Sequence, residues 1–339
     1  MTGRVRQAMS KAARATIEFG ATRIASSEWL MSIAYDVINK DNFTGLGAHE
    51  EMLSDSVRVG AYHRGIHRNV QPGDVVLDLG TGTGVLAMMA SRAGAKKVYA
   101  VEHSEFIEVA REIATRNGFT NIEFVQANSR EFTPPEKVDV VLHEQMGDEL
   151  FNENMLENLL DLRRRVLRPG GRILPARFRL FIEPVSLRET MRVRRFWNID
   201  LPDGIDLGFM QSSPVAARFD HERMEHMWAR AGSVERTVGT PSPAMEFDLD
   251  TLESAGALPT DFVIERVADD DMVVDGACVW FEAVFDDETA LTTSPLAPVT
   301  SWGNRMFRLD RQVAKGDTLR LRVRISELDE PSTWAVSES

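Results

Sequence analysis

The sequence predicts an α/β fold in which a doubly wound, mainly parallel sheet is followed by an antiparallel β-barrel domain with a helical arm. Over residues 74–174, short apolar segments alternate with segments of helical periodicity, which is typical of parallel strands covered by helices on both faces. After Pro175, strand-like segments follow one another between turn residues, which favours an antiparallel barrel or sandwich. The chain has 339 residues, enough for two packed domains.

The alternation in the first half is regular. Five strands are expected at residues 75–79, 97–102, 122–125, 138–142 and 172–174. The connecting helices are expected at residues 86–92, 106–117 and 156–167. Residues 1–40 and 49–70 also carry apolar side chains at helical spacing. The basic N-terminus faintly resembles a transit peptide, but an amphipathic helix accounts better for its pattern, because it lacks the apolar core of a secretory signal.

The second half of the chain has a different residue pattern. Five strand-like segments lie at residues 244–247, 262–267, 277–285, 304–309 and 318–325. Residues 186–232 are polar and mixed, with several Met and Trp, and we expect a helical or irregular arm there. The predicted organisation is therefore N-terminal helices over residues 1–48, a sheet domain over residues 49–175 and a barrel domain over residues 176–339.

Composition excludes several classes of protein. The net charge of -13 argues against a general nucleic-acid binder, which needs a basic face to neutralise phosphates. A solvated acidic surface accounts for this charge, which is also compatible with a cationic substrate. No apolar run approaches the roughly 20 residues of a membrane span, and we expect a cytoplasmic protein. Cys278 is the only cysteine, so we expect no intrachain disulfide and no metal site, and interpret it as a buried small hydrophobe.

A glycine-rich loop joins the first expected strand to the following helix. Asp78 stands directly before the pattern Gly-x-Gly-x-Gly, which includes Gly80 and Gly82. Glycines let the backbone approach a ligand where a Cβ would clash. Glu102 ends the next strand, where a carboxylate can accept hydrogen bonds from both ribose hydroxyls. The combination resembles the class I methyltransferases, which implies a Rossmann-like domain that binds S-adenosylmethionine. A nicotinamide cofactor is the alternative, because dinucleotide-binding folds also place glycines here.

A second motif follows the fourth expected strand. It resembles the loop of the protein arginine methyltransferases, in which two glutamates stand at this separation around a Met-Gly and before a Met-Leu. The matching residues are Glu144, Met146, Gly147, Leu150, Phe151, Glu153, Met155 and Leu156. The resemblance implies an S-adenosylmethionine-dependent methyltransferase whose catalytic residues are Glu144 and Glu153, with Met155 on the substrate side.

The chemistry of a guanidinium explains why two carboxylates are needed. The group is planar, permanently charged and a poor nucleophile. Two carboxylates can hold it in a fork and draw positive charge toward the nitrogens they contact, so that the remaining nitrogen attacks the methyl group. Taken alone, Glu144 and Glu153 would be interpreted as solvated loop acids.

Two further segments extend the resemblance over residues 35–325. The segment at residues 47–58 is similar to the one that folds over the cofactor in that family, which implies that Arg58 binds the cofactor carboxylate while His49 and Met52 line the pocket. The segment at residues 293–302 is similar to the barrel stretch that reaches the active site, which implies that Ser301 and Trp302 lie on the substrate side. A homodimer that forms through the arm is also implied.

The sequence departs from the family pattern mainly on the substrate side. Ser301 stands where the family has a histidine thought to orient a glutamate or assist proton loss, and Gln145 replaces a tryptophan. On the adenine side, beside Ser129, Arg130 replaces an acid. Asn39-Lys40 replace an aromatic pair and Phe43 a tyrosine. Only six of the 39 basic residues are lysines, which is typical of a GC-rich genome and favours a divergent bacterial member.

Taken together, these features predict an N-methyltransferase acting on a guanidino group. The acceptor is expected to be free arginine, a guanidino metabolite or protein arginine, and the departures favour one other than a standard peptide arginine. A small-molecule N-, O- or C-methyltransferase of secondary metabolism is the first alternative. The second is a cofactor-binding scaffold without turnover.

Overall fold

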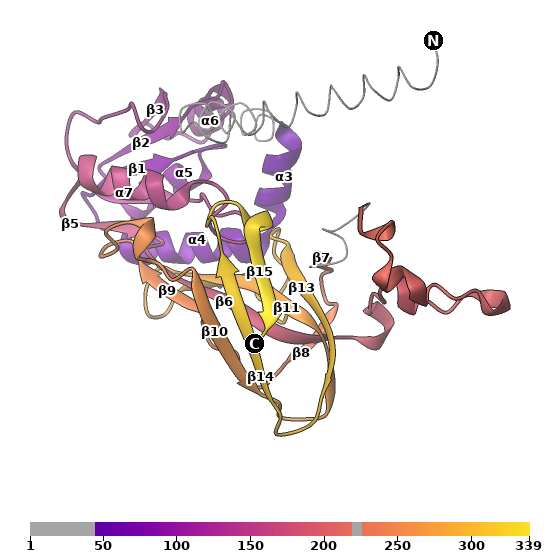
Figure 1. Ribbon diagram of the computed structural model, residues 1–339. Coiled ribbons are helices and arrows are strands. Elements are labelled where there is room, and N and C mark those ends of the chain that lie inside the picture. Colours follow the sequence, from indigo (N-terminus) through magenta and orange to yellow (C-terminus); the bar gives the residue numbers. More distant parts are fainter. Residues whose placement is uncertain (1–44, 219–225) are drawn as a thin grey trace, which may run out of the picture. The chain divides into compact units, whose positions relative to one another are not determined.

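The computed structural model describes residues 45–218 and 226–339. The chain divides into two compact units, Met1–Glu51 and Met52–Ser339, and each is described by itself. In the first unit, the description starts just before helix α3, Leu46–Ser54, which runs on into the second unit. The second unit holds a parallel sheet with its helices and a larger set of antiparallel strands (Figure 1). The helix expected within residues 1–40 lies outside the described residues.

The parallel sheet has five strands in the order β3-β2-β1-β4-β5. Their bounds are β1 Val75–Leu79, β2 Lys97–Glu102, β3 Ile122–Gln126, β4 Val138–His143 and β5 Leu167–Leu174. Every residue of the central strand β1 is buried, which explains its continuous apolar pattern. The chain moves outward from β1 to β3 and then returns to β4 on the other side. This reversal lies between β1 and β4, the place where open α/β sheets bind ligands at the carboxyl ends of their strands.

Helices cover both faces of this sheet. The helices that follow α3 in the chain are α4 Ser56–Asn69, α5 Val85–Ala93, α6 Ile107–Arg116 and α7 Met155–Arg165. Because the connections run in opposite directions from the reversal, right-handed crossovers place α5 and α6 on one face and α7 on the other (Figure 1). The predicted doubly wound sheet is confirmed.

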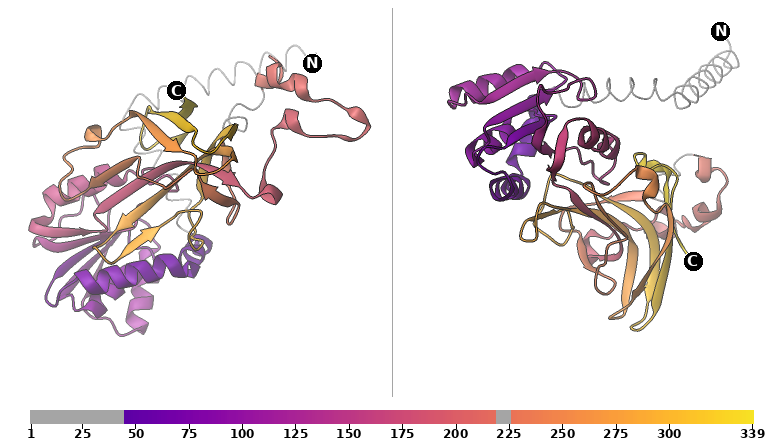
Figure 2. Two further views of the ribbon diagram at one scale, coloured as in Figure 1. Left: turned by 90° about the horizontal axis from the view of Figure 1, so that it is seen from below. Right: turned by 90° about the vertical axis from the view of Figure 1, so that its left-hand side faces the viewer.

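The barrel domain follows β5 and consists of antiparallel strands. One sheet contains β7-β13-β11-β6-β8 with β9 and β12 paired to it, and a second contains β10-β14-β15. Figure 2 shows this domain beside the parallel sheet within the second unit. The strands are β6 Arg177–Leu187, β7 His226–Ala229, β8 Val234–Thr237, β9 Met245–Asp248, β10 Asp261–Val267, β11 Met272–Val284, β12 Ala290–Thr292, β13 Asn304–Val313, β14 Thr318–Ile325 and β15 Trp334–Glu338.

The predicted arm is correct in its middle and wrong at its ends. β6 continues to Leu187 and β7 begins at His226, so both ends of the expected segment are strands that pair within the barrel. Between them, the described residues form short 3₁₀ helices, because Pro202 and several glycines interrupt regular helix formation. These helices are η1 Glu189–Met191, η2 Phe196–Asn198, η3 Pro202–Gly204, η4 Gly208–Ser212 and η5 Ala216–Arg218.

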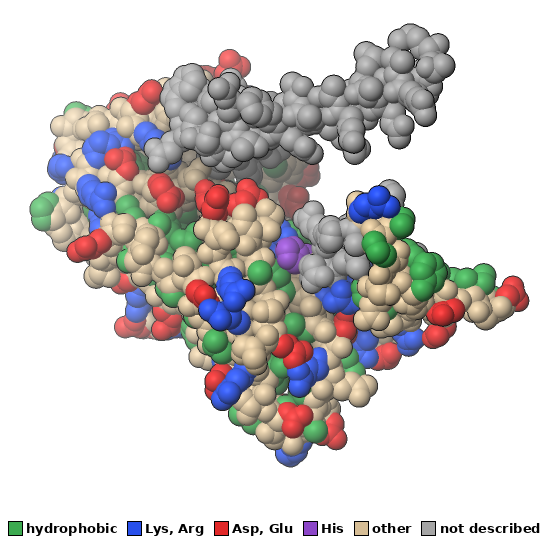
Figure 3. Space-filling view, in the orientation of Figure 1, with side chains coloured by type: hydrophobic (Ala, Val, Ile, Leu, Met, Phe, Trp, Pro, Cys, Tyr) green, Lys and Arg blue, Asp and Glu red, His purple; other side chains and the backbone are tan. Residues whose placement is uncertain are grey.

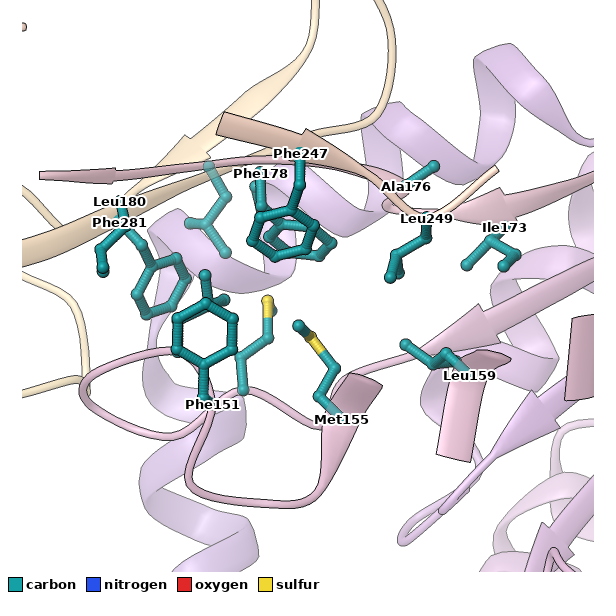
Figure 4. Packing of buried hydrophobic residues seen from close by; sticks show 14 of the residues in the cluster. Phe151, Met155, Leu159, Ile173, Ala176, Phe178, Leu180, Phe247, Leu249 and Phe281 are labelled. Atoms are coloured by element: carbon teal, nitrogen blue, oxygen red, sulfur yellow. The ribbon is translucent and has the colours of Figure 1, made fainter. Parts of the chain in front are cut away.

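Apolar packing joins the sheet domain to the barrel. Phe151, from the loop after β4, stacks on Phe247 of β9 with ring centroids 5.7 Å apart, and Phe178 of β6 stacks on the same ring at 5.3 Å. Met155, the first residue of α7, points into this group (Figure 4). Cys278 is fully buried on β11, as predicted. Large side chains from both domains therefore fix the loop after β4 and the start of α7.

No helix in the described ranges is long and apolar enough to cross a membrane.

Helix α4 also contacts the barrel, and this contact yields a stability prediction. A Cβ built on Gly65 would lie 2.4 Å from the ring of Phe285, whereas one built on Gly60 meets only the mobile end of Arg64 at 3.3 Å. Gly65→Ala should therefore lower the free energy of unfolding by about 1–3 kcal/mol through overpacking. Gly60→Ala, the matched control, should raise it by up to about 1 kcal/mol through helix propensity. Urea denaturation measures both, and equal stability of the two variants would contradict the close packing.

Candidate active site

The glycine loop lies between β1 and α5 and adopts the backbone that its sequence predicts. Gly80, Gly82 and Gly84 all have positive φ, at 65°, 50° and 78°. A Cβ built on Gly80 would meet no atom within 4 Å, so the backbone here borders open space. Gly84 caps α5 and lies close to Ala110 and Phe124, which tightens the strand-to-helix turn. The loop thus leaves room for a ligand at the N-terminus of a helix.

Asp78 is fully buried at the end of β1. Its Oδ2 accepts hydrogen bonds from the Thr81 hydroxyl at 2.5 Å and the Ala87 amide at 3.0 Å. Its Oδ1 has no partner within the described part of the chain. Burial raises the pKa of this carboxyl to about 7, although both hydrogen bonds oppose the shift. A buried oxygen without a partner is rare, and it fits a cationic or hydrogen-bonding ligand group beside the glycine loop.

Glu102 ends β2 next to the same loop. It accepts hydrogen bonds from the amides of Gly82 at 3.2 Å and Ser104 at 3.0 Å. Burial alone would raise its pKa, but hydrogen bonds from His103 and Ser104 outweigh it and lower the pKa to about 2. Glu102 is therefore charged at neutral pH. Its contact with the two hydroxyls of a ribose, the role that its position predicts, stays a prediction.

The loop after β3 carries Ser129 and Arg130. Arg165 of α7 holds this loop by donating to the Ser129 carbonyl at 2.7 Å. Arg130 Nε donates to Asn158 Oδ1 at 3.1 Å, and Asn158 Nδ2 donates to Gln145 Oε1 at 3.3 Å. Two residues that depart from the family pattern thus belong to one hydrogen-bonded chain through a buried asparagine. The contact of Ser129 and Arg130 with the adenine stays a prediction.

Glu144 and Glu153 stand at the two ends of the loop after β4. The loop folds back on itself through the isolated bridge between Gly147 and Leu150, where Leu150 has φ 79°, and Asn154 then starts α7 with φ 51°. These two left-handed residues reverse the chain within a few positions. The predicted pair thus lies on one compact loop, and the charges of the two glutamates influence each other.

Contacts with β13 and the segment before it hold this loop. Trp302 Nε1 donates to the Met146 carbonyl at 2.7 Å, and the Gly303 amide donates to Asp148 Oδ1 at 2.6 Å. Arg305 Nε pairs with Glu149 Oε1 at 2.6 Å, and both side chains are almost entirely buried. No role was predicted for Asp148, Glu149 or Arg305, because the sequence carries no signal of this pairing across 156 positions.

Burial raises the pKa of both glutamates. For Glu144 the pKa rises to about 8, since the neighbouring charges of Glu153 and Asp55 add to burial and Arg58 only partly opposes it. For Glu153 it rises to about 7, with Arg58 again opposing and Asp148 adding. These carboxyls bind protons more tightly than solvated glutamates do, as expected for groups held out of water for a cationic partner.

Arg58 of α4 brings the N-terminal and barrel segments together. Its guanidinium forms an ion pair with Glu144 and donates to Met52 Sδ at 3.3 Å and to Ser301 Oγ at 3.4 Å. It also lies over the Trp302 ring, 4.6 Å from the centroid. The structure thus assembles four residues that were predicted from separate parts of the sequence, around the first glutamate.

Two predicted site residues stand apart from this group. Met155 has no exposed surface and packs in the interdomain core, so the structure does not place it on the substrate side (Figure 4). His49 lies on α3 within the unit Met1–Glu51, and its contact with the cofactor stays a prediction. Asn39, Lys40 and Phe43 lie outside the described residues. No three His, Cys, Asp or Glu side chains in the described residues form a metal site.

The raised pKa of Glu153 predicts how stability depends on pH. The folded chain binds a proton at Glu153 up to about pH 7, whereas the unfolded chain releases it near pH 4.5. Ionisation of Glu153 therefore lowers the free energy of unfolding as pH rises through this window. Glu153→Gln cannot ionise, so its stability relative to the wild type should rise between pH 5 and 8, by on the order of 1–3 kcal/mol.

Urea denaturation at several pH values measures this difference. Glu157→Gln, at an exposed position of α7, is the control and should show no such change. A constant difference between Glu153→Gln and wild type from pH 5 to 8 would mean that Glu153 titrates as it does in water.

Comparison with known proteins gives the family. Residues 76–171 match a family model described as a methyltransferase domain. Protein arginine N-methyltransferase 6 of Danio rerio is 32% identical over 285 residues, which cover 82% of this chain and 80% of that protein. Protein arginine N-methyltransferase PRMT10 of Oryza sativa subsp. japonica is 30% identical over 308 residues, covering 80% of this chain and 78% of the relative.

Solved structures of arginine methyltransferases are also similar to this chain. The Trypanosoma brucei PRMT1 enzyme-prozyme heterotetrameric complex with AdoHcy matches with a TM-score of 0.69 and 27% identity, covering 83% of this chain and 88% of that one. Arabidopsis thaliana protein arginine methyltransferase 10 matches with a TM-score of 0.71 and 26% identity, covering 88% and 97%. The predicted resemblance is confirmed, and the chain belongs to the protein arginine N-methyltransferase family of S-adenosylmethionine-dependent enzymes.

Proposed function

We propose that this chain transfers the methyl group of S-adenosylmethionine to a guanidino nitrogen of arginine in a protein, with Glu144 and Glu153 as the guanidinium clamp. One observation carries the proposal: two largely buried carboxyls with raised pKa values lie at the ends of one loop, beside the reversal point of the sheet. The printed names of the relatives support arginine in a protein as the acceptor, over free arginine or a guanidino metabolite.

The cofactor site is proposed from the glycine loop and its neighbours. Gly80 borders open space near the start of α5, and Gly82 follows it in the loop. Asp78 Oδ1, which has no partner among the described residues, suits the ammonium of the methionine moiety. Glu102 would accept from the ribose hydroxyls, and Arg58, with Met52 beside it, would bind the carboxylate. Bound S-adenosylmethionine supplies an electrophilic methyl group on a sulfonium.

The two glutamates prepare the acceptor. When the guanidinium enters, its charge favours ionisation of both carboxyls, which then accept its N–H groups in a fork. The nitrogen that they leave free would be the one to accept the methyl group, with the sulfur of the cofactor as the leaving group. The attacking nitrogen must also lose a proton, and a carboxylate whose pKa lies near neutrality can take that proton and pass it to water.

A second copy of the chain is the partner that the arm favours. Between β6 and β7, several large apolar side chains are exposed to solvent, and Figure 3 shows hydrophobic atoms on this projection. They are Val193, Ile199, Leu201, Ile205, Phe209 and Val215. The end of the arm next to β6 is fixed to the barrel by ion pairs from Arg192 to Asp275 and from Arg195 to Asp310. A fixed arm with an apolar surface suits a symmetric contact.

Light scattering at micromolar concentration tests this assembly. The wild type should have twice the mass of the 38.0 kDa chain, and the double variant Ile205→Asp, Phe209→Asp should have the mass of one chain, because buried unpaired charges oppose association. Val263→Asp, at an exposed apolar position of β10, is the control and should stay dimeric. A monomeric wild type would contradict the proposed dimer.

Replacement of the glutamates tests the proposed chemistry. Glu144→Gln and Glu153→Gln keep the size of each side chain but remove the charge that binds the guanidinium, so methylation of an arginine-rich peptide should fall at least about a hundredfold, or about 2.7 kcal/mol. The affinity for S-adenosylhomocysteine, measured by calorimetry, should change less than about threefold for Glu153→Gln, because among the described residues Arg58 forms its ion pair with Glu144 and not with Glu153. Glu157→Gln is the matched control on α7.

A panel of acceptors separates the competing functions. The peptide, free arginine and simple amines are offered to the enzyme in turn. Methylation of free arginine alone would show that the enzyme acts on a metabolite and not on a protein. If both glutamine variants methylate their best acceptor at the wild-type rate, the two glutamates do not bind a guanidinium. A nucleophile other than a guanidino nitrogen is then methylated. Binding of the cofactor without methylation of any acceptor would favour the scaffold.

A further inference from the structure

Asp55 is a buried carboxylate beside the proposed site. It lies between α3 and α4 and is 9% exposed. Its Oδ1 caps α4 by accepting the Arg58 amide at 2.9 Å. Its Oδ2 accepts from Ser301 twice, from the amide at 2.8 Å and from the hydroxyl at 3.2 Å. One carboxylate therefore joins the start of α4 to the barrel segment that precedes β13.

These bonds fix which partner the Ser301 hydroxyl donates to and which it accepts from. A hydroxyl has one proton to donate, and this one donates to Asp55 Oδ2. Its lone pairs are then left to accept, and Arg58 donates to it at 3.4 Å. The chain of bonds runs from the guanidinium through the hydroxyl to the carboxylate. A serine in this state has no role as a base, because its oxygen accepts from one donor while its proton is held by a carboxylate.

The same contacts restrict the Arg58 guanidinium. Asp55 fixes the backbone of Arg58, the Ser301 hydroxyl accepts from one end of its side chain, and the Trp302 ring covers its face. The other terminal nitrogen forms the ion pair with Glu144. A long arginine side chain loses much rotamer freedom when it is held this way, so the cost of ordering it is met before a ligand binds.

We propose that Asp55 and Ser301 are positioning residues that act through Arg58, and we name Asp55, Ser301 and Arg58 the Asp55 clasp. The clasp holds the guanidinium beside Glu144, where Arg58 would bind the cofactor carboxylate, and its serine takes no part in proton transfer. This inference rests on the proposed function for the ligand of Arg58. It explains how serine suffices where a histidine was expected, since the backbone amide of residue 301 makes the shorter of the two bonds to Asp55.

A set of variants tests the clasp by affinity as well as by stability. Asp55→Asn retains a good cap for α4 but lacks the second acceptor oxygen for Ser301. It should weaken the calorimetric affinity for S-adenosylhomocysteine about tenfold, Ser301→Ala about threefold, and the double variant no more than Asp55→Asn alone. Ser301→Thr should retain the wild-type affinity because it keeps the hydroxyl.

Asp74→Asn is the matched control, since Asp74 is also buried and accepts from a loop amide, that of Gln71, at 2.8 Å. It should unfold at lower urea concentration with unchanged affinity for S-adenosylhomocysteine. If Asp55→Asn behaves in the same way, with affinity within twofold of the wild type, Asp55 is only a helix cap and the inference is overturned.

Failure of the proposed function would give a different result. A wild-type chain that binds no S-adenosylhomocysteine would refute the cofactor assignment. The clasp itself is then decided by urea unfolding of Asp55→Asn, Arg58→Gln and the double variant. Losses of stability that add within error would show that Asp55 does not hold Arg58, whereas a double loss smaller than the sum would support the clasp.

Discussion

The burial of two carboxyls on one short loop is the constraint on which the site depends. The partial burial of Glu144 and Glu153 raises their pKa values to about 8 and about 7, so the folded chain holds them at a cost. Only a structure that fixes the loop from both sides can maintain this arrangement. The rest of the second unit provides that fixation, through apolar packing on one side and polar contacts on the other.

The apolar fixation comes from the junction of the two domains. Phe151 lies between the two glutamates in sequence, and its ring stacks on Phe247 of the barrel. The polar fixation comes from the segment before β13, where Trp302 and Gly303 bond to the loop and Arg305 neutralises Glu149. Contacts from the barrel are therefore required for the geometry of the loop that carries Glu144 and Glu153.

Sequence reasoning predicted the features with local signals. β1 and its glycine loop were predicted closely, because a fully buried parallel strand has a continuous apolar pattern and the turn requires glycine. Short strands such as β7 were missed, since its four residues are partly exposed and become a strand by pairing with β13. Side-chain pairs far apart in sequence, such as Glu149 with Arg305, leave no local pattern. The burial of Met155 was not predicted, because its motif gives its position in the chain and not its exposure.

Proton release during acceptor binding tests the central claim most directly. Calorimetric titration of an arginine-rich peptide into the enzyme saturated with S-adenosylhomocysteine, in buffers of different ionisation enthalpy at pH 7, counts the protons exchanged. Since the pKa of Glu153 is about 7 and Glu144 already pairs with Arg58, the guanidinium must displace the proton of Glu153 to form the clamp, and we predict release of roughly half a proton per site. The release should vanish at pH 9.5. Tight binding with no proton exchange at pH 7 would contradict the account, because the carboxyls would then already be ionised or would take no part in binding.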